Sequence, residues 1–147
     1  APNQLLVEPD DFHIDPRGRR VLSSVIEDDR GALYGVPIGG TAPARRLVLL
    51  PQATTPFYFA VSPDNRWAVY ATDALRDGKI ELFRVRMDGS ELPMRISDAR
   101  VPGDVDFGPG DIVITASGSV VYMVGAGSPF HRDLYTNRID SPAPGVR

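Results

Sequence analysis

The chain has 147 residues, a formal net charge of −3 and no cysteine. These properties exclude a disulfide framework and argue against a nucleic-acid-binding surface, which usually carries a basic stripe. The sequence contains no apolar run long enough to cross a bilayer and no signal-peptide pattern of a charged start followed by an apolar stretch. The lack of cysteine fits the cytoplasm, the periplasm or the cell surface, and a periplasmic or secreted location is favoured.

Residues 11–49 predict short strands separated by turns. The turn Asp15-Pro16-Arg17-Gly18 follows a short strand and precedes an apolar one. Gly39-Gly40 marks a later turn, before a last strand that begins near Arg46. Proline fixes φ near the value that a turn requires, and glycine permits positive φ, so both residues favour turns here. We therefore expect four strands in this segment.

Residues 57–97 repeat this plan with clearer signals. Ser62-Pro63-Asp64-Asn65 predicts a turn, because Asp and Asn bond their own backbone and Asn tolerates positive φ. Asp88-Gly89 is a strong hairpin signal, and we expect its glycine to adopt positive φ. The strand from Ile80 to Met87 alternates apolar and polar residues, with Phe83 as the exception. The other expected strands are Phe57 to Val61, Trp67 to Thr72 and one that begins at Met94.

Residues 105–147 form a third and less regular copy. Ser117-Gly118 takes the place of the first turn, although the proline is missing, and Asp140-Ser141 takes the place of the second. The later halves of the three copies have the same spacing without a gap. The matched positions are Tyr34, Ile38, Gly40 and Arg46 in the first copy, Phe83, Met87, Gly89 and Arg95 in the second, and Tyr135, Ile139, Ser141 and Arg147 in the third.

A repeat of about 50 residues is typical of a solenoid, a propeller or an array. Four short antiparallel strands per repeat are the plan of a β-propeller, in which each repeat is one blade. No stretch shows helical periodicity with capping residues. The sequence therefore predicts an all-β fold: a partial β-propeller of three four-stranded antiparallel blades that forms a single unit over residues 1–147.

The second copy resembles the TolB-like β-propeller repeat. The resemblance is carried by Ser62-Pro63-Asp64-Asn65, Glu81-Leu82-Phe83, Asp88-Gly89-Ser90 and Arg95-Ile96-Ser97. The first and third copies match less closely, and together the copies cover the chain from about Phe12 to its end. The resemblance implies the propeller fold and leaves the activity open, since one fold serves many functions.

The sequence contains no recognisable catalytic constellation. There is no nucleophile elbow, no Walker loop and no His-Glu-x-x-His motif. The two histidines, His13 and His131, lie in predicted strands and are expected to have no special role. Asp104, Asp106 and Asp111 leave a cation site open, although no complete calcium-loop pattern surrounds them. We therefore expect no catalytic residue, no cofactor and no metal ion, and we expect that the chain is not an enzyme.

Trp67 has two interpretations. It either packs against a neighbouring blade or forms an exposed recognition anchor, because large aromatic residues are enriched in both settings.

Three blades are too few for a closed ring, since propellers usually close with four to eight. The chain stops at Arg147, where its sister repeats enter their last strand, so we expect a fragment or a partner that supplies the remaining blades. Two chains related by a two-fold axis would make a six-bladed ring, and a homo-oligomer is expected. The predicted interface residues are Val120, Val121, Tyr122 and Met123, of which the pair that faces outward from the third blade would lie in the contact.

Two functions fit these features. The first is a non-enzymatic interaction module or scaffold that completes its ring with another chain and binds protein or other ligands through its loops. The alternative is the propeller portion of a larger enzyme, such as a prolyl oligopeptidase-type serine peptidase, whose catalytic domain is absent from this chain. The expected partner is protein, either a second copy or the remainder of a cleaved parent chain, and we expect neither nucleic acid nor a membrane span.

Overall fold

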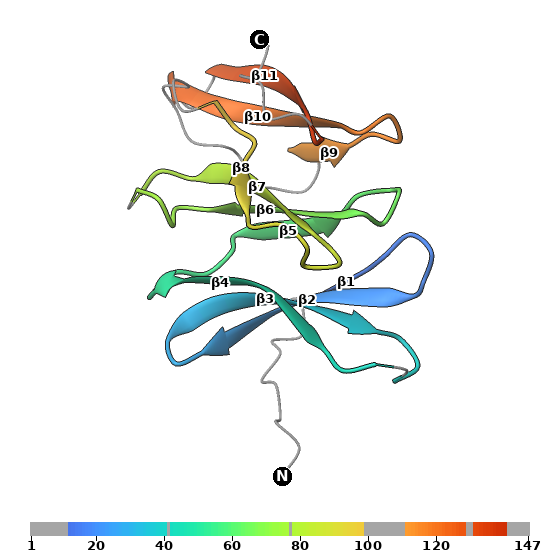
Figure 1. Ribbon diagram of the computed structural model, residues 1–147. Coiled ribbons are helices and arrows are strands. Elements are labelled where there is room, and N and C mark those ends of the chain that lie inside the picture. The colour runs from blue at the N-terminus through green and yellow to red at the C-terminus, as the bar shows by residue number, and fades with distance from the viewer. Residues whose placement is uncertain (1–11, 41, 77, 99–110, 129–130, 141–147) are drawn as a thin grey trace.

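The computed structural model describes residues 12–40, 42–76, 78–98, 111–128 and 131–140, which contain eleven β-strands and no helix. The strands form three antiparallel sheets in chain order, stacked face to face (Figure 1). The all-β fold with three blade-like sheets is therefore confirmed. The part of the chain that the structure describes contains no candidate membrane-spanning helix.

Blades 1 and 2 are four-stranded meanders, in which each strand pairs with the next along the chain. Blade 3 has three strands in the described part of the chain, and the position predicted for its fourth strand lies outside the described residues. Blade 1 contains β1 (Phe12–Ile14), β2 (Arg20–Glu27), β3 (Arg30–Pro37) and β4 (Arg45–Gln52). Blade 2 contains β5 (Tyr58–Val61), β6 (Trp67–Thr72), β7 (Glu81–Arg86) and β8 (Met94–Arg95), and blade 3 contains β9 (Ile112–Ile114), β10 (Ser119–Ser128) and β11 (His131–Arg138).

The first turn of every blade has the same backbone structure. The residue that opens it, Asp15, Ser62 or Thr115, donates its amide to the carbonyl at the start of the following strand, over 2.8 to 2.9 Å. Gly18, Asn65 and Gly118 occupy the matching position of the turn, with φ values of 64°, 61° and 82°. All three turns lie at the right-hand edge of the stack in Figure 1. The predicted equivalence of these turns is confirmed.

The turns between the third and fourth strands also match. The amide of Ile38 donates to the Arg19 carbonyl and that of Met87 to the Arg66 carbonyl, so both turns begin at the same point of the blade. Gly89 has a φ of 65°, as its place after Asp88 predicted.

We expect Gly89→Val to lower the free energy of unfolding by about 1 kcal/mol or more, because a β-branched residue is strained at positive φ. A Cβ atom at this position would also lie 2.6 Å from Nε of Arg45, but that side chain is flexible and can move away. Urea titration measures the change. Gly89→Asn is the matched control, since asparagine tolerates this backbone conformation, and a Val variant as stable as the Asn variant would contradict the placement.

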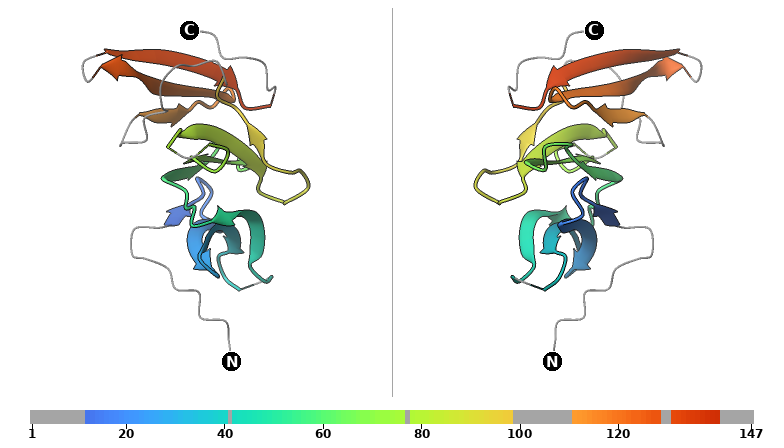
Figure 2. Two further views of the ribbon diagram at one scale, coloured as in Figure 1. Left: turned by 90° about the vertical axis from the view of Figure 1, so that its left-hand side faces the viewer. Right: turned by 90° about the vertical axis from the view of Figure 1, so that its right-hand side faces the viewer.

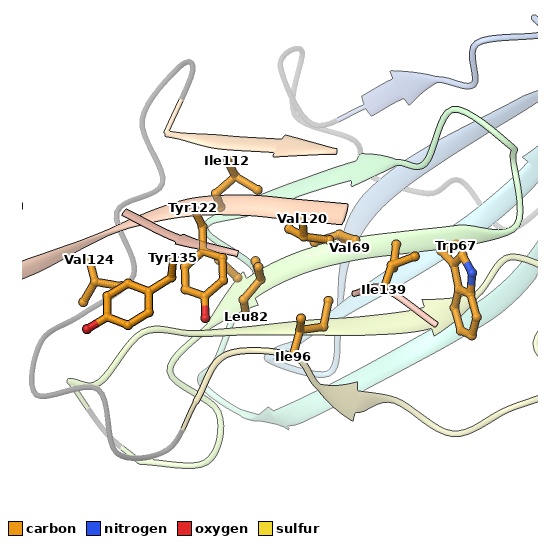
Figure 3. Close-up of a cluster of buried hydrophobic side chains, with 11 residues drawn as sticks. Trp67, Val69, Leu82, Ile96, Ile112, Val120, Tyr122, Val124, Tyr135 and Ile139 are labelled. Carbon is orange, nitrogen blue, oxygen red and sulfur yellow. The ribbon is translucent and has the colours of Figure 1, made fainter. Parts of the chain in front are cut away.

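Among the described residues the hydrophobic core consists of two clusters, one at each junction between blades (Figures 1 and 2). At the junction of blades 1 and 2, Leu22, Leu33 and Leu50 pack with Phe59, Tyr70 and Phe83, among others. At the junction of blades 2 and 3, Val69, Leu82 and Ile96 pack with Val120, Tyr122 and Tyr135, among others (Figure 3). The three sheets therefore pack face to face through apolar side chains.

Blade 2 is covered on both faces, which explains why apolar residues of β7 point to both sides of the sheet. Phe83 and Val85 face blade 1, whereas Leu82 and Arg84 face blade 3. Because neither face meets bulk water, the strand shows no division into an apolar and a polar side.

Candidate functional site

Each junction between blades contains a stacked pair of aromatic rings at equivalent positions. Tyr70 stacks on Phe83 with ring centroids 5.5 Å apart, and Tyr122 stacks on Tyr135 at 5.9 Å. In each case the pair belongs to the later blade and faces the earlier one. Burial raises the pKa of Tyr122 to about 12, and its hydroxyl donates to Oδ1 of Asn137 at 3.3 Å.

The structure separates the four predicted interface residues into two faces. Val120 and Tyr122 are fully buried against blade 2, where they belong to the core cluster of Figure 3. Side chains alternate along a strand, so Val121 and Met123 point to the opposite face of blade 3. Both are half-buried. The outward pair is therefore Val121 and Met123.

The outward face of blade 3 repeats positions that are buried in the other blades. Leu33, Leu82 and Leu134 are equivalent by the spacing of the copies and by their place in the sheets. Leu33 and Leu82 face the next blade and are 0% exposed, whereas Leu134 is 61% exposed. Val121 is likewise equivalent to Val69, which is 0% exposed. Blade 3 thus presents the apolar surface that blades 1 and 2 bury.

The outward face of blade 1 is the counterpart of that surface. Phe12 is equivalent to the buried Phe59 and is 49% exposed, and Ile38 is equivalent to the buried Met87 and is 46% exposed. Tyr34 takes the place of Phe83 and donates its hydroxyl to Glu27, which also pairs with an arginine of β4. This hydrogen bond is the main reason that the pKa of Glu27 is lowered.

Trp67 packs at a junction between blades, and the exposed-anchor interpretation is wrong. The residue is 4% exposed and belongs to the cluster between blades 2 and 3. The guanidinium groups of Arg84 and Arg86 lie 4.1 and 4.0 Å from its ring. Arg84 also donates to the Ile139 carbonyl of blade 3, so this buried cation connects the two sheets. Cation–π contacts of this kind contribute most when the cation is desolvated.

The two histidines lie in different blades and do not share a site. The rings of His13 and Phe59 are arranged edge to face, with centroids 5.5 Å apart, and His131 is exposed at the start of β11. Asp104 and Asp106 lie outside the described residues, so the open cation site is untested. Within the described ranges, no group of three or more His, Cys, Asp or Glu side chains is placed to hold a metal ion.

A cleft of about 680 Å³ lies between blades 1 and 2, at the edge where their first turns meet. Five arginines and three aspartates are among its lining residues, which leaves two positive charges in excess. They are Arg17, Arg19, Arg20, Arg66 and Arg86, together with Asp15, Asp64 and Asp88. We call this the arginine cleft. The sequence showed only its first part, the run from Arg17 to Arg20, because the other members come from distant positions.

The aspartates of the arginine cleft are engaged in their own turns. Asp15 accepts the Arg19 amide at 2.6 Å, and Asp88 accepts both the amide and the hydroxyl of Ser90. Burial alone would raise the pKa of Asp64, but hydrogen bonds from the Ser62 hydroxyl and the Arg66 amide outweigh it and lower the pKa. The hydrogen bond from the Ser90 hydroxyl is the main reason that the pKa of Asp88 is lowered.

Two of the five arginines are also engaged. Arg20 donates to the Met87 carbonyl at 3.0 Å, which links blade 1 to blade 2, and Arg86 pairs with Glu91 at 2.9 Å. The guanidinium groups of Arg17, Arg19 and Arg66 make no hydrogen bond or ion pair with the described part of the chain. All three residues are exposed. The arginine cleft therefore offers three cationic groups to a ligand.

Stacked four-stranded meanders with this connectivity define a β-propeller arc. The propeller is TolB-like: solved structures of a putative TolB from Agrobacterium tumefaciens and of TolB from Acinetobacter baumannii have the same fold. The first has a TM-score of 0.63 and 23% identity over 88% of this chain and 45% of that chain. The second has a TM-score of 0.58 and 15% identity over 93% of this chain and 31% of that chain.

The fold is also similar to that of the AtxE2 isopeptidase with bound Astexin3-dC4, with a TM-score of 0.68 and 12% identity over 90% of this chain and 28% of that chain. The chain thus spans less than half the length of each of these solved structures. No family model and no curated protein matches its sequence.

Proposed function

We propose that this chain is a non-enzymatic propeller module, which docks another set of blades on its open faces and binds ligands through its loops. The observation that carries the proposal is Leu134, an apolar residue that is 61% exposed although its two equivalents are fully buried between blades. A face of this kind on a soluble protein marks an interaction site.

The occupant of this face is the first blade of a second copy. The outward face of blade 1 exposes Phe12 and Ile38 at the positions that blades 2 and 3 bury, so the two open faces are the halves of one junction. Two three-bladed arcs joined at both ends give six blades, within the usual range for closed propellers. By two-fold symmetry the two contacts are identical.

A double variant with Val121→Asp and Met123→Asp tests this role. Because an uncompensated charge buried at an interface costs several kcal/mol, we expect the dimer dissociation constant to rise at least about 100-fold. Sedimentation velocity over a concentration series measures it. Leu92→Asp is the control, since this residue is 88% exposed in the β7–β8 connection of blade 2, the central blade.

The wild-type chain is expected to sediment with twice its mass of 16.0 kDa. A wild-type chain that remains monomeric and folded at micromolar concentration would contradict docking of a second copy. That result would favour the alternative, in which the same face packs on further blades of a longer polypeptide, as in an enzyme whose propeller accompanies a catalytic domain. The similarity to the AtxE2 isopeptidase supports keeping this alternative.

A further inference from the structure

The arginine cleft continues into a second cavity with a different chemical character. This cavity has a volume of about 370 Å³ and shares Arg20, Met87 and Asp88 with the arginine cleft. Its other lining residues are mostly apolar or small: Gly35, Pro37, Ala42, Pro43, Ala44 and Arg45. The two cavities therefore lie side by side along the junction of blades 1 and 2, and charged side chains line most of the first, whereas apolar or small residues line most of the second.

From this arrangement we infer that the arginine cleft binds an acidic peptide segment of a partner protein. The carboxylates of the segment pair with Arg17, Arg19 and Arg66, and a neighbouring apolar side chain enters the second cavity. Arginine forms two parallel hydrogen bonds to a carboxylate, which gives both strength and orientation. The inference deepens the proposed function, because it names the ligand that the loops of the interaction module would bind.

A peptide fits the cleft better than a phosphate polymer for two reasons. The carboxylates of Asp15, Asp64 and Asp88 lie among the arginines and repel any anionic group, but a peptide also carries backbone N–H groups, which can donate to these carboxylates. The apolar cavity beside the arginines also suits a hydrophobic side chain. In addition, Oδ1 of Asn65 borders the cleft as a buried acceptor without a hydrogen-bond partner in the described residues.

The test is a nuclear magnetic resonance titration that follows the arginine Nε–H signals of the full chain. The probe is the peptide acetyl-Leu-Asp-Glu-Asp-Glu-amide, and its control is the same peptide with asparagine and glutamine in place of the acids. We expect the signals of Arg17, Arg19 and Arg66 to shift with the acidic peptide alone. The shift should weaken several-fold as salt rises, because the pairs are exposed to solvent.

The variants separate this site from the assembly face. Arg17→Gln combined with Arg66→Gln is expected to weaken peptide binding about tenfold, since two charge-assisted pairs with the carboxylates of the peptide are lost. Arg138→Gln, an exposed arginine of blade 3 that pairs with Asp140, is the matched control and is expected to bind like the wild type. The variant with Val121→Asp and Met123→Asp is expected to keep peptide binding, so that failure of the assembly proposal and failure of this one give different results.

Two outcomes would overturn the inference. One is the absence of any shift at the three arginines with the acidic peptide. The other is a short oligothymidylate that shifts these signals at lower concentration than the peptide does, because this would assign the cleft to phosphate ligands.

Discussion

Leu82→Ala is expected to lower the free energy of unfolding by about 3 kcal/mol, within the range for large-to-small changes in a core. The side chain is 0% exposed and belongs to the cluster between blades 2 and 3 (Figure 3). It has no polar atom and no route to solvent, so truncation removes apolar contacts and leaves a cavity between two sheets. Guanidinium titration followed by tryptophan fluorescence measures the loss, since Trp67 belongs to the same cluster.

Leu92→Ala is the control for this prediction. Leu92 is 88% exposed, so its truncation is expected to change the stability by no more than about 0.5 kcal/mol. Equal effects of the two truncations would show that the blades do not pack through the face that contains Leu82.

Gly31→Ala is expected to destabilise the chain by about 2 to 3 kcal/mol, because the added methyl group overpacks a rigid site. A Cβ atom at Gly31 would lie 2.6 Å from the Thr54 carbonyl oxygen and 2.8 Å from Cα of Thr55. Both are backbone atoms, so no side-chain rotation relieves the contact. The Gly31 amide also donates to the Thr54 carbonyl at 2.7 Å, and this hydrogen bond ties β3 to the connection between blades 1 and 2. Thermal denaturation measures the loss.

Gly35→Ala is the matched control on the same strand. A Cβ atom at Gly35 would lie 3.6 Å or more from its nearest neighbours, the side chains of Leu47 and Met87, which is an ordinary contact distance. The φ of this residue is not positive, so alanine is unstrained and the melting temperature is expected to change little. If the Gly31 and Gly35 variants had the same melting temperature, the close approach of Gly31 to Thr54 would be contradicted.

The sequence allowed prediction of the blades because turns are encoded locally. Asp15 to Gly18, Ser62 to Asn65 and Asp88-Gly89 each combine residues that fix or permit the turn backbone, and their spacing gives the period. The TolB-like resemblance was confirmed at the level of the fold for the same reason.

The faces of the blades could not be assigned from the sequence. Val120 to Met123 is a continuous apolar run, so it does not show which pair meets blade 2. Only the packing of blade 3 on blade 2 places Tyr122 inward and Met123 outward. Trp67 was ambiguous for a similar reason, since the arginines that cover its ring come from the next strand.

The arginine cleft was missed because it is assembled across two blades. Arg17 and Arg19 were visible as a basic run, but Arg66 lies in the next copy of the repeat and joins them only when the sheets stack. One signal was available. When the copies of the repeat are aligned, their first turns fall at the same edge of the stacked sheets, so basic residues in the first turns of adjacent copies are expected to lie close together.

Cross-linking from the outward face of blade 3 tests the central claim most directly. The chain has no cysteine, so Thr136→Cys introduces a unique thiol on the exposed strand position opposite Val121, to which a benzophenone maleimide can be attached. Docking of a second copy predicts a cross-linked species of twice the chain mass. The cross-link is expected to join the label to a segment of the second copy that contains Phe12 or Ile38. The same label at Ser117→Cys, in the first turn of blade 3, serves as the control. Monomer alone after irradiation, or the same cross-links from both labelled positions, would contradict docking of a second copy on the outward face of blade 3.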